Sequence, residues 1–133
     1  MLIEFFTEVF FIKIKVKGYL KNLTESSKEI INTKGIKNSN TISYIIDNTK
    51  HKIFIDNNKI TLLRESNEFS HVMIFEESNT YQSEYYLKES NYSLEFNIET
   101  TKLILDNNKI DITYKIIESE NVYNYVLEVS DNL

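Results

Sequence analysis

The sequence contains no cysteine, proline, tryptophan or alanine, and it has two glycines, Gly18 and Gly35. Without cysteine the chain forms no disulfide and no thiolate metal site, so its composition fits a reducing compartment and we expect a cytoplasmic protein. Arginine is almost as scarce. Of the 15 basic residues, Arg64 is the one arginine, so we expect chemistry that lysine does not supply at that position.

The chain also lacks an excess of positive charge and a long uninterrupted apolar run. Its net charge of -5 argues against a general binder of phosphate backbones, so nucleic acid is not an expected partner. The first twenty residues are rather apolar, but Glu4 and Glu8 precede any lysine, and lysines from Lys13 onward interrupt the run. Because a membrane helix needs about 20 consecutive apolar residues, we expect no membrane span and no signal peptide.

With 133 residues, of which 41% are hydrophobic, the chain is predicted to form a single domain over residues 1 to 133. Residues 1 to 11 are ambiguous, because their apolar side chains have helical spacing. We interpret them either as a short helix that caps an apolar opening or as an extension of the first strand. No pattern in the sequence indicates the oligomeric state.

From Ile12 onward the apolar residues alternate with polar ones, as Ile12, Ile14 and Val16 do with the lysines between them. This period of two is typical of a half-buried β-strand. The alternation weakens between Gly18 and Glu29, where we expect a loop or a short helical turn. Further alternating segments follow at short, regular intervals, separated by polar turns. The sequence therefore predicts an all-β protein.

The pentapeptide DNNKI occurs twice, at an offset of fifty residues. If Asn57 and Asn58 are the central residues of a hairpin turn, Ile55 pairs with Ile60 and Ile53 with Leu62, so the apolar residues share one face. The same arithmetic around Asn107 and Asn108 pairs Leu105 with Ile110 and Leu103 with Ile112. Asparagine tolerates the positive φ of type I′ turns, and the spacing does not fit a calcium loop. Both copies are predicted to be tight turns and not metal sites.

Two more hairpins follow from the same reasoning. A turn at Asn48 and Thr49 pairs Tyr44 with Ile53, and a turn at Ser119 and Glu120 pairs Tyr114 with Tyr125. The apolar positions of the strand from Tyr92 change parity near Thr100, which predicts a β-bulge there. Residues 70 to 76 fit either register. Long bent strands of this kind favour a single antiparallel meander that closes into a barrel.

Four features of the chain occur together: a Ser-Tyr strand, a lone arginine after an apolar strand, a strand that ends in Glu-Thr, and a tyrosine in the penultimate strand. The residues are Ser43, Tyr44, Arg64, Glu99, Thr100 and Tyr114. With these features, the order of the segments over roughly residues 12 to 129 resembles the YwiB-like family of small bacterial proteins. That resemblance implies a lipocalin-like (calycin) barrel of about eight to ten strands, and it implies no particular activity.

Arg64 has the parity of Ile60 and Leu62, so alternation directs its guanidinium into the barrel, where an unpaired charge is costly. Two interpretations remain open. In the first, Arg64 binds backbone carbonyls or an internal acid such as Glu76 or Glu84 and closes one end of the barrel. In the second, its planar fork binds the anionic head of a ligand inside the barrel.

Tyrosines gather on the inward face by the same parity, and their hydroxyl groups need partners when the rings are buried. A filled core and a lined ligand cavity are both consistent with this pattern. The tyrosines with inward parity are Tyr44, Tyr81, Tyr85, Tyr92, Tyr114, Tyr123 and Tyr125.

The usual signatures of catalysis and cofactor binding are missing from the sequence. There is no glycine-rich phosphate loop, no Gly-x-Ser-x-Gly motif and no HExxH motif. His51 and His71 are the two histidines, and no pattern offers them a third metal ligand. We therefore expect a protein that is not an enzyme, without a metal or cofactor.

The leading hypothesis is a barrel that binds a small apolar or anionic amphipathic ligand in its interior. The candidate contacts are Arg64, Tyr44, Tyr85, Tyr114 and Tyr125. The alternative is a protein-interaction module with a solid core, which binds a partner through its outer face or its N-terminal segment. An internal space that reaches Arg64 favours the first hypothesis, and a large exposed apolar patch favours the second.

Overall fold

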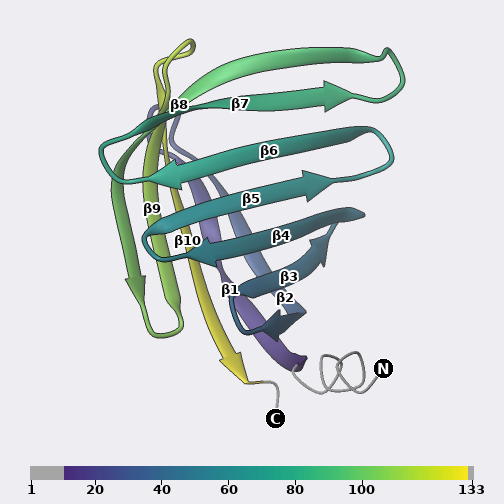
Figure 1. The fold of residues 1–133 in the computed structure, drawn as a ribbon, viewed down its shortest axis with the longest axis vertical. Helices are drawn as coiled ribbons and strands as arrows, with labels where there is room; N and C mark the ends of the chain where they lie inside the picture. Colours follow the sequence, from purple (N-terminus) through teal and green to yellow (C-terminus); the bar gives the residue numbers. More distant parts are fainter. Residues whose placement is uncertain (1–10, 132–133) are drawn as a thin grey trace.

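The structure is a computed structural model that describes residues 11 to 131. These residues form an antiparallel β-barrel in which each strand pairs with the next and β1 also pairs with β10 (Figure 1). The prediction of an all-β meander closed into a barrel is confirmed. The ten strands are β1 (Ile12–Asn22), β2 (Ser27–Asn38), β3 (Thr41–Ile46), β4 (Thr49–Asp56), β5 (Lys59–Glu65), β6 (Phe69–Glu76), β7 (Thr80–Leu87), β8 (Tyr92–Asp106), β9 (Lys109–Ile116) and β10 (Asn121–Asp131).

The barrel has two walls whose strands cross. Strands β3 to β7 lie side by side across the view of Figure 1, while β9, β10 and β1 run behind them along the long axis. Strand β8 belongs to both walls because it bends at a bulge between Thr100 and Lys102. The change of parity near Thr100 therefore marks the corner at which the sheet folds over, as predicted.

The interior is a single aliphatic and aromatic core. Inward side chains from nine strands are almost completely buried, and Ile14, Ile53, Phe75, Ile112 and Leu127 are each at most 1% exposed. Strand β6 places Met73 and Phe75 inside, which settles the register of residues 70 to 76. Alternation of inward and outward side chains is thus what organises the sheet around one core.

Both DNNKI turns are confirmed as tight hairpins. Ile55 pairs with Ile60 around the first, and Leu105 pairs with Ile110 around the second. Asn57 and Asn107 have φ values of 55° and 47°, but Asn58 and Asn108 do not have the positive φ that a type I′ turn needs at its second position. Asparagine supplies left-handed backbone at the first position of each turn, without an ion.

Two other predicted hairpins are wrong by two residues. Ile46 pairs with Thr49, so the turn is at Asp47 and Asn48, both of which have positive φ and which suit a type I′ turn better than a β-branched threonine does. At the C-terminal hairpin Ile116 pairs with Asn121, around a loop of residues 117 to 120. Because both shifts are even, every side chain stays on its predicted face.

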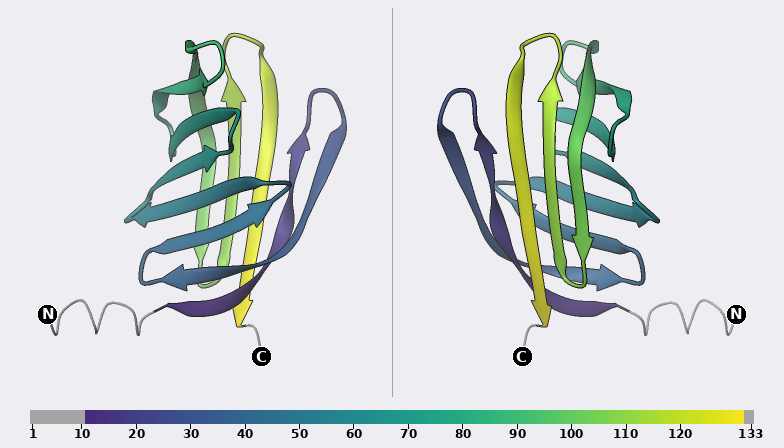
Figure 2. Two further views of the ribbon diagram at one scale, coloured as in Figure 1. Left: turned by 90° about the vertical axis from the view of Figure 1, so that its right-hand side faces the viewer. Right: turned by 90° about the vertical axis from the view of Figure 1, so that its left-hand side faces the viewer.

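The region from Gly18 to Glu29 is not a loop. Strand β1 continues to Asn22 and β2 begins at Ser27, so a long hairpin occupies it. The alternation is weak here because the inward positions carry Gly18 and Asn22 as well as Leu20. The Asn22 side chain accepts hydrogen bonds from the amides of Thr24 and Glu25, both at 3.0 Å, and it thereby stabilises the turn. Figure 2 shows the tip of this hairpin standing apart from the opposite wall.

Tyr92 and Leu94 are corrected from inward to exposed positions, at 54% and 37% exposure. Strand β9 pairs with β8 from Ile98 onward, whereas residues 92 to 96 pair with β7 alone. No opposite wall covers this end of β8, so a side chain with inward parity is still open to solvent.

The two glycines permit close packing of neighbouring strands. A Cβ atom on Gly18 would lie 1.8 Å from the carbonyl oxygen of Val126, and one on Gly35 would lie 2.4 Å from that of Ser43. Both distances are shorter than any real contact, so side chains at these positions would force β10 and β3 away from their neighbours.

Residues 11 to 131 contain no helix that is long and apolar enough to cross a membrane. The helix or strand extension proposed for residues 1 to 11 lies outside the described residues, apart from Phe11, which is half exposed and precedes β1.

Candidate functional site

A cavity of about 220 Å³ opens inside the barrel, between the β1–β2 hairpin and the wall that contains β3 to β6. Figure 2 shows the hairpin and that wall diverging on this side of the molecule. The cavity is lined by Leu20, Glu29, Ile31, Tyr44, Ile46, His51, Leu62, Arg64, His71, Met73, Tyr114, Ile116, Tyr123 and Tyr125.

A row of directly paired residues runs across five strands, and its members on β3 to β6 form one wall of the cavity. Tyr44 pairs with His51, His51 with Arg64, Arg64 with His71, and His71 with Tyr85. Cross-strand neighbours on one face lie close enough for their side chains to touch. Sequence reasoning missed this row, although the pairing that matches Ile53 with Leu62 also matches His51 with Arg64.

Arg64 is held between the two histidines. Its Nε donates to Nε2 of His51 and its terminal nitrogen NH1 lies against Nδ1 of His71, each at 3.4 Å. Its guanidinium carbon also lies 5.3 Å from the centre of the Phe69 ring. A guanidinium has donors and no acceptor, so both imidazole nitrogens that face Arg64 must carry lone pairs.

This requirement fixes the tautomer of each neutral histidine. His51 keeps its proton on Nδ1, which lies 3.2 Å from the carbonyl oxygen of Thr49. His71 keeps its proton on Nε2 and donates it to the Ser83 hydroxyl at 2.9 Å, and that hydroxyl donates to the carbonyl oxygen of Val72 at 2.6 Å. Backbone carbonyls therefore orient both rings with their lone pairs toward Arg64.

The positive charge of Arg64 is not neutralised within residues 11 to 131. The ion pairs in this part of the chain involve lysines, at Lys88, Lys102 and Lys109, and not Arg64. Glu76, which we considered as an internal partner of Arg64, instead accepts the Tyr81 hydroxyl at 2.6 Å. Glu29 contributes a carboxylate to the edge of the cavity from β2. Three of the five guanidinium donors face no protein acceptor among the described contacts.

Both histidines are neutral near pH 7. Burial, followed by the charge of Arg64, lowers the pKa of His51 and of His71 from 6.5 to about 4. An imidazolium at either position would lose solvation and lie beside a like charge. The site therefore carries one permanent cation and two uncharged rings.

On the opposite side of the cavity, β9 and β10 contribute Tyr114, Tyr123 and Tyr125, and Tyr44 of the row meets this group. The hydroxyls of Tyr44 and Tyr125 are hydrogen-bonded to each other, the Tyr44 ring stacks on His51 with 4.5 Å between centroids, and the Tyr114 ring stacks on Tyr123 at 5.2 Å. Burial raises the pKa of Tyr44 to about 12 and raises the pKa of Tyr114 and of Tyr125 as well. These phenols are neutral hydrogen-bond donors.

The structure thus brings four of the five candidate contacts into one cavity, namely Arg64, Tyr44, Tyr114 and Tyr125. The fifth, Tyr85, does not line it. Its ring stacks on Phe69 at 4.9 Å and lies 5.0 Å from the His71 ring, so it supports the row from outside the cavity.

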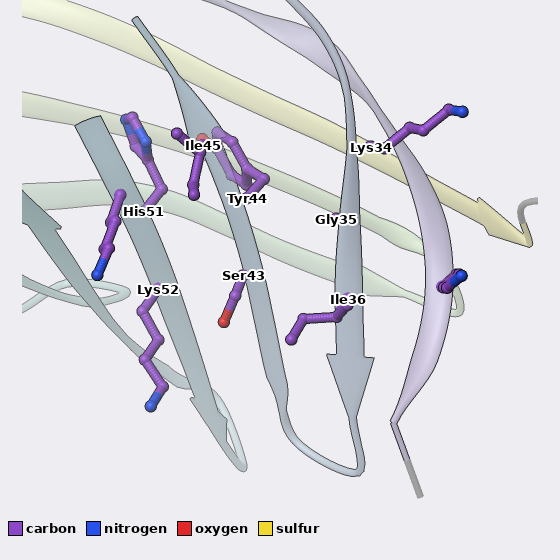
Figure 3. A pocket seen from close by; sticks show the side chains of 10 residues that line it. Lys34, Gly35, Ile36, Ser43, Tyr44, Ile45, His51 and Lys52 are labelled. Atoms are coloured by element: carbon purple, nitrogen blue, oxygen red, sulfur yellow. The ribbon is translucent and has the colours of Figure 1, made fainter. Parts of the chain in front are cut away.

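A larger groove of about 580 Å³ lies on the outer surface over β2, β3 and β4, with Lys13 of β1 at its border. Figure 3 shows Lys34 and Lys52 extending from its edges, with Ile36 and Ile45 between them. Lys50 completes a set of four lysines, and the floor is apolar, with Ile36 and Ile45 at 42% and 57% exposure. Tyr44 and His51 line both this groove and the inner cavity.

Metal binding finds no support in residues 11 to 131, where no group of three or more histidine, aspartate or glutamate side chains gathers. The two histidines of the cavity turn their lone pairs toward a cation, and a metal ion would have to displace Arg64 to reach both.

No protein-family model matches the chain, and no curated protein matches it. Among solved structures, the chain is similar to the crystal structure of the ywiB protein from Bacillus subtilis, with a TM-score of 0.66 and 19% identity over 92% of each chain. The chain therefore has the same β-barrel fold as that protein. The predicted resemblance is thereby confirmed for the fold. At 19% identity, the similarity does not assign the role of any residue of the ywiB protein to a residue of this chain.

Proposed function

We propose that this YwiB-like barrel is a binding protein for a small organic anion, which enters the inner cavity and is held by Arg64. The observation that carries the proposal is a partly buried guanidinium with two neutral histidines as its neighbours and no carboxylate of residues 11 to 131 paired with it. A carboxylate or phosphate ligand would supply the missing negative charge through charge-assisted hydrogen bonds.

The size of the cavity limits the ligand. Sites for drug-sized ligands are typically about 300–1,000 Å³, and the cavity measures about 220 Å³. Its walls combine aliphatic side chains such as Leu62 and Met73 with the faces of Tyr114 and Tyr123. A single aromatic ring or a short alkyl chain that carries one acidic group fits this space better than a long-chain fatty acid does.

The hydrogen-bond donors of the cavity walls also suit an anionic ligand. The Tyr44 and Tyr125 hydroxyls bond to each other, and because one of the pair must be the donor, the other keeps a proton to offer. Their raised pKa values keep both groups protonated, so the walls present donors to a ligand at any physiological pH. A ligand rich in acceptors is therefore favoured over a cation or an amine.

The experiment is a calorimetric titration of the full chain with benzoate and hexanoate, compared with benzamide and hexanol of similar size and no charge. We expect both anions to bind more tightly than their neutral analogues. In Arg64→Gln we expect the affinity for the anions to fall at least about tenfold, because a charged hydrogen bond contributes about 1.5–3 kcal/mol.

Lys88→Gln is the matched control, because Lys88 is a cation in a surface ion pair with Glu65, the neighbour of Arg64 in sequence. This variant should bind benzoate as the unmodified chain does. Equal affinities for benzoate and benzamide, or equal losses in the Arg64 and Lys88 variants, would refute the proposal.

A second candidate function rests on a separate observation, the outer groove with its four lysines and apolar floor. Under this alternative the protein binds a partner through an acidic, apolar peptide segment, whose carboxylates would meet the lysines while its apolar side chains cover Ile36 and Ile45. The groove and the cavity lie on opposite faces of the same sheet, so each hypothesis has its own variants.

A synthetic peptide of alternating glutamate and phenylalanine is a suitable probe for the groove. Perturbed backbone amide resonances along β2 to β4, lost in Lys34→Glu/Lys52→Glu and kept in Arg64→Gln, would support the interaction module. Unperturbed resonances in that region at millimolar peptide would exclude it.

A further inference from the structure

We propose that the inner cavity takes up its anionic ligand together with a proton, which binds to His51 or His71. The proposal rests on the proposed anion site at Arg64 and adds a regulatory property to it, namely a dependence of affinity on pH that Arg64 alone cannot produce. The proposed sites of protonation are the two imidazole nitrogens that face the guanidinium, Nε2 of His51 and Nδ1 of His71.

In the structure these nitrogens accept from Arg64, so their lone pairs face a cation. Protonation of either one would turn an acceptor into a donor facing another donor, and it would place two positive charges within hydrogen-bond distance. The second nitrogen of each ring is fixed by a protein partner, the Thr49 carbonyl for His51 and the Ser83 hydroxyl for His71. The extra proton can therefore enter only on the side that faces Arg64.

Few other charged or titratable groups near the histidines could make the affinity for the ligand depend on pH. Arg64 is the cation between them, and Glu29 is the carboxylate at the cavity edge. The remaining groups are phenols, and burial raises the pKa of three of them, Tyr44, Tyr114 and Tyr125, so these three stay protonated near neutral pH. The groups in contact with a histidine ring are Tyr44 of β3, Arg64 of β5 and Tyr85 of β7. The other titratable groups that line the cavity are Glu29 of β2, Tyr114 of β9, and Tyr123 and Tyr125 of β10.

A bound anion reverses the local balance of charge. Once a carboxylate or sulfonate occupies the donors of Arg64, the guanidinium and the ligand together are nearly neutral, and an imidazolium beside them gains an attractive partner in the anion. The anion thereby offsets the charge of Arg64, which after burial is the second cause of the lowered pKa of both histidines. By linkage, a ligand that raises the pKa of a histidine binds more tightly as the pH falls toward that pKa.

The proton comes from solvent and returns to it when the ligand leaves, so no covalent bond forms or breaks in the ligand. The net result is that one anion and one proton enter the cavity together. The coupling of the two binding events gives the site a preference for ligands delivered at mildly acidic pH.

The experiment uses benzenesulfonate as the probe, because a sulfonate stays charged across the whole range and its own titration cannot mimic the effect. Its dissociation constant is measured by calorimetry on the full chain between about pH 8 and about pH 5.5, the range in which a histidine titrates. We expect the dissociation constant to fall with pH, with a slope that approaches tenfold per pH unit for one proton taken up.

The variant His51→Gln/His71→Asn keeps an acceptor near the position of each imidazole nitrogen that faces Arg64 and removes its basicity. Its readout is the slope of affinity against pH and not the affinity itself, and the slope should vanish. The unmodified protein provides a second measurement that needs no variant. In the imidazole resonances, which belong to two histidines in the whole chain, at least one pKa should rise when benzenesulfonate is added.

The outcomes separate this inference from the function on which it rests. Tighter binding at low pH together with a raised histidine pKa supports both. Binding of benzenesulfonate with the same dissociation constant across the range overturns the proton uptake and leaves the anion site standing. No binding of benzenesulfonate or benzoate at any pH overturns both.

Discussion

The two ends of the barrel interior are built by the same strands and have opposite chemistry. Along six of the strands the inward residues change from hydrocarbon at one end of the barrel to a polar side chain at the other. The changes are Ile42 to Tyr44 on β3, Ile53 to His51 on β4, Ile60 to Arg64 on β5, Phe75 to His71 on β6, Ile112 to Tyr114 on β9 and Leu127 to Tyr125 on β10. We call these the apolar end and the polar end.

The apolar end is filled with buried aliphatic side chains such as Ile53 and Ile112, and a second pocket of about 230 Å³ opens at its rim beside the turn at Asn107 and Asn108. The polar end encloses the cavity that contains Arg64. Dense packing of aliphatic groups stabilises a fold, but it provides no polar group to which a ligand could bind specifically. The polar end contains groups that lower stability unless they find partners, and Arg64 is the clearest of them. Because the apolar end stabilises the fold and the polar end contains the groups that could bind a ligand, the barrel can hold a cavity without losing its core.

Ile53→Ala should have the largest effect on stability, because Ile53 lies in the apolar end and is 0% exposed. Truncation of a buried isoleucine leaves a cavity and costs about 2–5 kcal/mol. Urea denaturation followed by circular dichroism measures the loss. A cost below about 1 kcal/mol would mean that the apolar end is not densely packed, and the comparison would fail.

Tyr125→Phe should have a smaller effect, of about 1–3 kcal/mol, because it leaves the buried Tyr44 hydroxyl without its partner. Tyr44→Phe/Tyr125→Phe removes both hydroxyls and should cost less than the sum of the two single changes. Additive losses in a double-mutant cycle would show that the two phenols do not stabilise each other.

Lowering the pH should reduce the stability of the protein through the histidines of the polar end. The pKa of both histidines is about 4 in the folded chain and 6.5 when the chain is unfolded, so the unfolded state binds more protons between these values. Their contribution to stability is complete above about pH 6.5 and is lost as the pH falls toward 4. Denaturation midpoints of the unmodified chain should therefore fall more steeply in this window than those of His51→Gln/His71→Asn.

Arg64→Met should have the smallest effect on the empty protein. It removes a charge that the described part of the chain does not neutralise, so the free energy of unfolding should change by less than about 0.5 kcal/mol or should increase. Lys88→Met, which breaks a surface ion pair, is the control and should also lie within about 1 kcal/mol. A loss of more than about 2 kcal/mol in Arg64→Met alone would mean that Arg64 is a structural residue.

The sequence was sufficient for the fold because alternation carries most of the information. The two hairpins that we misplaced are each shifted by two residues, as at Ile46 and Thr49, and an even shift keeps every side chain on its face. The turn residues alone did not determine these registers. Tyr92 shows the limit of parity, because parity gives a direction and not the presence of an opposite wall.

The candidate site was predicted less completely. Parity placed Arg64, Tyr44, Tyr114 and Tyr125 inside, but the histidines became visible as partners of Arg64 only through the register across β3 to β6. The misplaced register of β3 and β4 paired His51 with Ile46 and concealed its contact with Tyr44. Cavity volume depends on how the walls diverge, and no local pattern encodes it.

The most direct test of the anion site follows from the single arginine of the chain. In ¹⁵N-labelled protein the Nε–H resonance of Arg64 is unambiguous, and its position can be followed while benzoate is added. The account predicts a saturable shift of this resonance that benzamide does not produce. An Arg64 resonance that stays in place while benzoate saturates the protein elsewhere would contradict it.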